Sequence, residues 1–554
     1  MARVVGMSTG PAGLSRSGVG VMPSPAGEPA RGRVLREAIL IALGVGLVYT
    51  AWSLSPLLLA GAFQDDGTYL ALGKAIASGA GYRSIYLPGA PVEVKYPPGL
   101  PLLLAALWSA GGTLELVRRL AVWLDVGAVA LSAGLIWAYG RRRLAPLPLA
   151  CLAIVPLLLD AAVQYGTLVI AEPYYLLGWA ACLCLIPGLM GARAGPRLAR
   201  AALLGLVLAA TTLFRTQGLV LVAAIVFGLA LQRAGTLTLL AVAAAALVPL
   251  LAWIVIQRHM LGMGPRATQL DERSYLSFLS DGITPAAIGA NAREYLTVFS
   301  AYLSRWRPVG GAAFLLFLLL ALVGSVREAQ RDPVLVASVL GNLGLLLVWP
   351  FSQDRLLVDI LPFAGLLAAA AVRGMGRGGR LPRMACSALL LLAACAVLVR
   401  QVAIQRGARQ ALVRGTDPGM FTPSYMLPAN SRAIYAISRW VLTHTSLQDR
   451  LLVSDHTGVY LYTARQAVTS GPVQNASTFS TPHRPGEYVA SSIVTDGVTV
   501  VVLDNLHAPA ARDIAALQRR CPGSLVYAGN AGVGTLPMFY RVRPLDACLA
   551  ALVK

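Results

Sequence analysis

Apolar runs long enough to cross a membrane recur through most of this chain, and they limit its possible folds more than any other feature. The first extends from Ala38 to Ala62, and about 20 predominantly apolar residues suffice to cross the roughly 30 Å hydrocarbon core of a bilayer. Hydrophobic residues make up 56% of the 554 residues and charged residues only 13%, with a mean hydropathy of +0.66. This pattern predicts a polytopic α-helical membrane protein and excludes an ordinary soluble one.

Clusters of arginine between the apolar runs predict how the chain is oriented. About eleven spans are expected, at 38–62, 116–140, 144–162, 173–190, 198–214, 217–232, 235–256, 310–324, 333–350, 355–372 and 384–402. With a cytoplasmic N-terminus, most of the arginines between spans fall in cytoplasmic connections, and Arg118, Arg119, Arg215 and Arg355 fall in short outer ones. This asymmetry is the positive-inside pattern. It explains the net charge of +21 without a nucleic acid as partner.

The segment from Pro97 to Gly112 decides the topology of everything that follows it. It begins with two prolines and offers fewer residues than a spanning helix needs. If it crossed the membrane, the excess of arginine would fall on the outer side, so we interpret it as a re-entrant or surface-lying helix. The polar segment after the first span and the C-terminal region are then expected outside the cytoplasm.

Composition divides the chain into four parts. Residues 1–36 are expected to form a disordered cytoplasmic tail, and 37–402 a membrane domain with an outer loop at 61–115. A linker at 403–429 precedes 430–554, where helices alternate with apolar strands and predict a small extracytoplasmic α/β domain. Within the membrane domain, aromatic residues between Arg258 and Pro308 favour helices that lie at the membrane interface.

Two cysteines of the C-terminal region bear on the compartment in which it lies. Cys521 and Cys548 can form a disulfide if this region is outside the cytoplasm. The other five cysteines lie in apolar runs and are expected to fill helix interfaces.

Six polar residues at the ends of predicted spans are expected on the same outer side. They are Asp65, Asp66, Lys95, Glu172, Arg215 and Arg355. Each also has a structural explanation: Asp66 can cap a helix that starts at Gly67, Glu172 suits a helix N-terminus, and an aspartate beside Arg355 can neutralise it. Lys95 and Arg215 can act as interfacial anchors. Together, however, the six favour a functional site.

This set of charges suits the transfer of a sugar from a polyprenyl phosphate. The departing phosphate needs cations, for which arginine offers two parallel hydrogen bonds and lysine a point charge. A carboxylate must take the proton of the acceptor hydroxyl as its oxygen attacks the anomeric carbon. Asp65 or Asp66 is therefore predicted as the catalytic base, and Lys95, Arg215 and Arg355 as the donor-phosphate site.

Five stretches also resemble one family. DDGTYLALGKAIASGAGY, YPPGLPLLLAAL, AEPYYLLGW, LFRTQGLVL and SQDRLLVDILPF occur in this order. They are similar to the bacterial type of GT-C glycosyltransferases, which is related to the protein O-mannosyltransferases and to the lipid A aminoarabinose transferase. The resemblance covers roughly residues 37–402. It implies an inverting, membrane-embedded glycosyltransferase of the bacterial cytoplasmic membrane, with a polyprenyl-phosphate-linked sugar as donor and a glycan, lipid or protein as acceptor.

The resemblance also implies roles for single residues. Asp65 is the first acidic residue of the matching DDGTY stretch, where the family has its catalytic base. The aminoarabinose transferase has a lysine directly before the proline pair that contacts the donor phosphate, whereas this chain has Tyr96 there and Lys95 one position earlier. Tyr69, Tyr96 and Glu172 are expected to contact the substrate. Some members of the superfamily use a divalent metal, so Mg²⁺ or Mn²⁺ near Asp66 or Glu172 stays an open alternative.

Two other functions compete with a transferase. A transporter or flippase of a lipid-linked glycan would place essential polar groups near the bilayer midplane, where Asp125 is the clearest deep carboxylate. We interpret Asp125 as a buried helix contact. A structural scaffold with the C-terminal domain as its active part is the third alternative.

Overall fold

The computed structural model describes residues 28–53, 58–262, 284–304, 307–349, 354–375, 380–414, 423–470, 486–504, 508–531, 537–543 and 547–553. Most of the predicted tail at 1–36 lies outside this part of the chain, and residues 28–36 already belong to the first helix. Three of the aromatic residues predicted at the interface, Tyr275, Phe278 and Trp306, also lie outside the described residues.

Within the described residues, seven helices are long and apolar enough to cross a membrane. They are α1 (Glu28–Ser53), α4 (Leu114–Arg141), α7 (Glu172–Met190), α8 (Ala194–Phe214), α10 (Thr236–Gly262), α13 (Arg307–Glu328) and α17 (Arg380–Arg414). All seven overlap predicted spans, although α1 ends at Ser53 and not at Ala62 as predicted, since residues 60–63 form a turn. Many of their leucines and valines face outward, as lipid-exposed helices require.

Four of the predicted spans correspond to shorter helical segments, so the number eleven stays a prediction. Three of these are α9 (Gly218–Leu231), α14 (Pro333–Val348) and α16 (Leu361–Met375). The 14 residues of α9 reach only about 21 Å at 1.5 Å per residue. The segment predicted not to cross forms α3 (Gly99–Ser109), which is 11 residues long.

Three further predicted boundaries were wrong. The span at 144–162 is divided into α5 (Pro146–Leu149), a π-helix (Ala150–Ile154), a 3₁₀ helix (Val155–Leu158) and then α6 (Asp160–Tyr165), since Pro156 supplies no amide to continue an α-helix. The span at 355–372 is interrupted between α15 (Asp354–Val358) and α16. Much of the predicted linker is helical, because α17 continues to Arg414 and α18 begins at Pro423.

The polar segment after α1 folds into two packed helices, α2 (Asp65–Ala77) and α3. Between them, an isolated bridge pairs Arg83 with Val92. The Tyr82 hydroxyl donates to the Tyr96 carbonyl at 2.8 Å and ties the start of this loop to its end. In the predicted interfacial region, the described residues form α12 (Pro285–Leu303), the end of α10 and the start of α13.

The C-terminal region contains a five-stranded mixed sheet in the order β2-β1-β3-β5-β4. Its strands are β1 (Leu451–Leu452), β2 (Ala467–Val468), β3 (Val500–Leu503), β4 (Leu525–Asn530) and β5 (Met538–Val542), and its helices α18 (Pro423–His444), α19 (His456–Thr463), α20 (Glu487–Asp496), α21 (Ala508–Arg520) and α22 (Ala547–Val553). β1 pairs in parallel with β2 and β3, while β5 pairs antiparallel with β3 and β4. Cys521 and Cys548 are joined in a disulfide.

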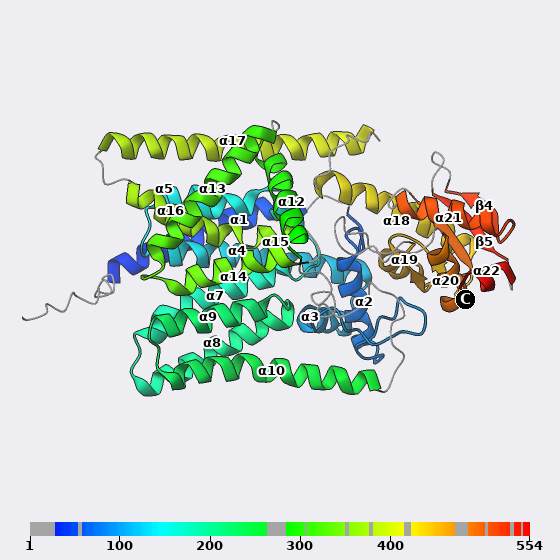
Figure 1. Ribbon diagram of the computed structural model, residues 1–554, viewed down its shortest axis with the longest axis horizontal. Helices are drawn as coiled ribbons and strands as arrows, with labels where there is room; N and C mark the ends of the chain where they lie inside the picture. The colour runs from blue at the N-terminus through cyan, green and yellow to red at the C-terminus, as the bar shows by residue number, and fades with distance from the viewer. Residues whose placement is uncertain are drawn as a thin grey trace, which may run out of the picture.

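The sheet lies beyond one end of the helical bundle, with α2 and α3 between the two (Figure 1). Helix α19 packs against α2. The loop that carries Asp65 is therefore enclosed by the bundle on one side and by the C-terminal region on the other.

Candidate active site

Separate elements bring the predicted polar residues to the bundle end that faces the C-terminal region. Asp65 and Glu172 are the first residues of α2 and α7, where a carboxylate is favoured by the helix dipole. Arg215 follows the last residue of α8, and Arg355 lies in the short helix α15. Lys95 lies in the loop before α3.

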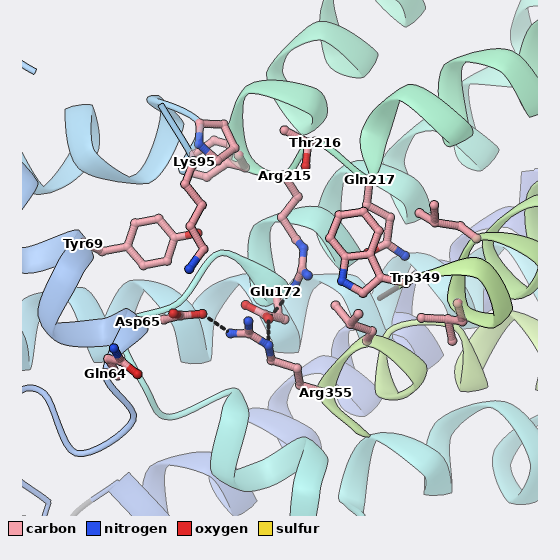
Figure 2. A pocket seen from close by; sticks show the side chains of 15 residues that line it. Gln64, Asp65, Tyr69, Lys95, Glu172, Arg215, Thr216, Gln217, Trp349 and Arg355 are labelled. Carbon is pink, nitrogen blue, oxygen red and sulfur yellow. Dashed lines mark ion pairs between the residues drawn. The ribbon is translucent and has the colours of Figure 1, made fainter. Parts of the chain in front are cut away.

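These five residues line one cavity (Figure 2). The complete lining is Gln64, Asp65, Tyr69, Lys95, Pro97, Glu172, Phe214, Arg215, Thr216, Gln217, Leu345, Leu346, Trp349, Arg355 and Leu356. The charged side chains gather in one part of it, and Trp349 lies beside Gln217 in another (Figure 2). Three leucines also line the cavity and add apolar surface. The arrangement can hold a ligand with an anionic head and an apolar chain.

A chain of ion pairs connects Asp65, the candidate base, to Arg355 and Arg215 through Glu172. Arg355 Nη1 lies 2.5 Å from Asp65 Oδ2, and its Nε lies 3.3 Å from Glu172 Oε1. Arg215 pairs with the same Glu172 oxygen and lies 3.8 Å from Asp359 Oδ2. The Arg355 and Glu172 side chains are only 9% and 6% exposed, so water screens these pairs weakly.

Asp65 is held by groups that favour its ionised form. Its Oδ1 accepts a hydrogen bond from the Tyr96 hydroxyl at 2.5 Å. Burial alone would raise the pKa of Asp65, but the charges of Arg355 and Lys95, together with the Tyr96 hydroxyl, outweigh burial and lower it. Tyr69 packs edge-on against Tyr96 with ring centroids 5.1 Å apart. Asp65 is therefore a carboxylate that faces the cavity.

Asp66 does not line this cavity, although the sequence suggested it equally with Asp65. Its Oδ2 accepts from the Gly61 amide at 2.8 Å and its Oδ1 from the Phe63 amide at 3.0 Å. It does not cap a helix that starts at Gly67, since α2 already begins at Asp65. Burial raises the pKa of Asp66 to about 6. The Asp66 side chain thus closes the turn that leads into α2.

Glu93 supports the site and was not predicted from the sequence. Its Oε1 accepts the backbone amides of Lys95 at 2.6 Å and Tyr96 at 3.1 Å, and its Oε2 accepts from the Ser84 hydroxyl at 2.9 Å. The side chain thereby shapes the turn that presents Lys95 and Tyr96. A carboxylate two residues before a lysine in a polar turn was the available sequence signal, but it is a weak one.

Gln64 and Gln217 were also missed. Gln64 has a φ of 65°, an uncommon backbone conformation for a residue with a side chain that often marks a functional site. Gln217 donates to Asn342 at 2.8 Å, and Asn342 also accepts from the Tyr175 hydroxyl at 2.7 Å. No local sequence pattern predicts these contacts, because Asn342 is distant in sequence from both Gln217 and Tyr175.

The residues near Asp66 and Glu172 do not fit a divalent metal. In the described part of the chain, no group of three or more His, Cys, Asp or Glu side chains could hold one. Glu172 is paired with two guanidinium groups, and Asp66 binds two backbone amides. We therefore derive no step through a metal.

No protein-family model and no curated protein matches the chain. Its structure is similar to that of ArnT from Cupriavidus metallidurans bound to undecaprenyl phosphate, with a TM-score of 0.53, 16% sequence identity, and coverage of 93% of this chain and 99% of that chain. It is also similar to the apo oligosaccharyltransferase of Archaeoglobus fulgidus, with a TM-score of 0.50, 13% identity, and coverage of 93% and 75%. The chain thus shares its fold with these two structures, which agrees with the fold that the sequence resemblance implied.

Proposed function

We propose that this protein is an inverting membrane glycosyltransferase that moves a sugar from a polyprenyl-phosphate donor to an acceptor hydroxyl. Asp65 is the catalytic base, and Lys95, Arg215 and Arg355 bind the donor phosphate. Tyr69, Tyr96 and Glu172 complete the substrate site. The observation that carries this proposal is the single cavity in which an ionised Asp65 faces two arginines and a lysine.

The proposed reaction is one displacement. The Asp65 carboxylate takes the proton of the acceptor hydroxyl while the acceptor oxygen bonds to the anomeric carbon. The electron pair of the breaking C–O bond goes to the phosphate, which leaves as polyprenyl phosphate. The cations stabilise the charge that grows on this leaving group. A single displacement from the opposite side inverts the anomeric centre.

The pair between Asp65 and Arg355 gives donor binding a second effect. A phosphate that binds Arg355 competes with Asp65 for the guanidinium, whose charge holds the pKa of Asp65 low. As this contact weakens, burial favours the protonated form of Asp65 more strongly. Donor binding thereby makes the carboxylate a stronger base when it is needed.

The proposed setting is the outer face of a bacterial cytoplasmic membrane, with eleven spans and an extracytoplasmic C-terminal region. The distribution of arginine supports this orientation. The Cys521–Cys548 disulfide supports an oxidising compartment for the C-terminal region. The acceptor class is a glycan, a lipid or a protein.

The test is turnover by purified Asp65→Asn, which keeps the shape of the side chain but cannot take a proton. A panel of synthetic undecaprenyl-phosphate hexoses and pentoses, with membrane extract as acceptor source, identifies a donor for the wild-type protein. We expect Asp65→Asn to fold, to bind undecaprenyl phosphate and to lose at least about a hundredfold in kcat. Wild-type turnover by this variant would refute the role of Asp65.

No comparable arrangement of residues supports the alternative that the protein is a flippase. Asp125, the carboxylate predicted for that alternative, is completely buried in α4 and does not line the cavity of Asp65. The polar residues that gather in one place lie at helix ends instead of at mid-helix.

A further inference from the structure

The turn before α2 is unusual in its backbone. Gly61 has a φ of 90° and Gln64 a φ of 65°, and the latter conformation is rarely adopted by a residue with a side chain. The next residue is Asp65, so the path of this turn determines where α2 starts and where the carboxylate lies. Asp66 and Thr68 hold the turn from its own side, since Asp66 accepts the Gly61 and Phe63 amides and Thr68 N donates to Gln64 O at 2.9 Å. Further contacts come from outside it.

Side chains of the C-terminal region bind the backbone of this turn. Leu59 N donates to Ser431 Oγ at 3.0 Å, Ala60 N donates to Tyr462 OH at 2.9 Å, Asn430 Nδ2 donates to Ala62 O at 2.9 Å, and Thr457 Oγ1 donates to Gln64 O at 3.0 Å. These four hydrogen bonds come from α18 and α19. They link residues about 400 positions apart in the chain.

The two parts also approach too closely for larger residues. A Cβ on Gly61 would lie 2.2 Å from the Cα of Gly458, and a Cβ on Gly67 would lie 2.4 Å from Thr457 Oγ1. Gly67 is in α2, two residues after Asp65. Helix α19 therefore contacts both the turn and the helix that carries the carboxylate.

We propose that the C-terminal region is a positioning element for Asp65, with Thr457 as the residue that fixes the turn at Gln64. This inference rests on the proposed function, because it assigns Asp65 the role of base. The groups that contact the carboxylate are Tyr96, from the loop before α3, and Arg355, from α15. The C-terminal region sets the backbone from which that carboxylate extends.

Thr457→Val tests this role, because valine has nearly the same shape and lacks the hydroxyl that donates to Gln64. Thr457→Ser restores the hydroxyl. The matched control is Thr463→Val in the same helix, whose hydroxyl donates within α19 to Val459 O at 2.7 Å and does not touch the turn.

A misplaced base slows the chemical step more than it weakens donor binding. With the donor found for the wild-type protein, we expect Thr457→Val to lower kcat by about tenfold or more and to leave KM within about twofold. Thr457→Ser should recover most of kcat, and Thr463→Val should keep the wild-type value. Equal losses in both valine variants, or none in Thr457→Val, would overturn the inference.

A second measurement needs no donor. The Gln64 and Asp65 amides donate within the turn to Gly61 O at 2.9 Å and Phe63 O at 2.8 Å. Their hydrogen–deuterium exchange should become faster in Thr457→Val and stay unchanged in Thr463→Val. Unchanged exchange in Thr457→Val would refute the positioning role. Asp65→Asn in the same kinetic assay separates the two proposals: its full activity contradicts the proposed function, whereas an inactive Asp65→Asn with a fully active Thr457→Val contradicts only this inference.

Discussion

Replacing Glu172 with glutamine removes one negative charge from between two buried guanidinium groups. Glu172 Oε1 pairs with Arg215 and lies 3.3 Å from Arg355 Nε. If the two arginines bind the donor phosphate, this carboxylate competes with the phosphate for them. Glu172→Gln should therefore lower the stability of the ligand-free protein and tighten its binding of undecaprenyl phosphate.

The expected magnitudes follow from burial and charge. Removing one partner of a buried ion pair costs about 3–5 kcal/mol, and the lower end applies because Asp65 and Asp359 still face the arginines. With an unfolding entropy of about 2.1 cal/mol/K per residue over 554 residues, a loss of about 3 kcal/mol lowers Tm by about 3 °C. A phosphate roughly 5 Å from Glu172 is repelled by about 3 kcal/mol at an effective dielectric of about 20. Removing this repulsion tightens binding by up to about a hundredfold.

The assay measures Tm and Kd in detergent at increasing undecaprenyl phosphate. Without ligand, the variant should have a lower Tm than the wild-type protein. Addition of ligand should raise the Tm of the variant by more than that of the wild-type protein. The control is Glu115→Gln, since Glu115 also pairs with two arginines, Arg118 and Arg119, at 2.7 Å each, but is 45% exposed and should change either quantity little. Weaker ligand binding by Glu172→Gln than by the wild-type protein would refute the proposal that Arg215 and Arg355 bind the donor phosphate.

Three further predictions follow from the charges and the disulfide. Arg355→Gln removes the strongest effect that opposes burial at Asp65 in the ligand-free protein, so the acid limb of the pH profile of kcat/KM should move to higher pH, and an unmoved limb would place the base elsewhere. Burial raises the pKa of Asp66 from 3.8 to about 6, so its contribution to stability is full below pH 3.8 and lost as the pH rises through 6. As the pH rises from 3.8 to 6, Tm should therefore fall less in Asp66→Asn than in the wild-type protein. Parallel curves of Tm against pH for the two proteins would contradict this prediction. Loss of the disulfide in Cys521→Ser/Cys548→Ser should cost about 2–4 kcal/mol, so reductant should lower the Tm of the wild-type protein and leave the double variant unchanged.

Much of the bundle could be predicted from the sequence because apolar runs and their arginine-rich ends are local signals. α1, α4, α7, α8, α10, α13 and α17 all overlap predicted spans. The charges at the ends of these runs are visible in the sequence for the same reason, and their catalytic and binding roles stay predictions. Helix interruptions were not predicted, as at Asp359, where two short helices meet inside one apolar run.

Which of Asp65 and Asp66 faces the cavity was decided by the tertiary structure. The two residues are adjacent in α2, but their side chains leave the helix in different directions, one to Arg355 and the other to the Gly61 amide. The roles of Glu93 and Thr457 were likewise hidden, because each acts on backbone groups whose positions the folded chain determines. The sequence by itself determined which elements form and which charges lie at their ends. Only long-range packing decided which of those charges share a cavity, since the contacts that bring them together join residues hundreds of positions apart.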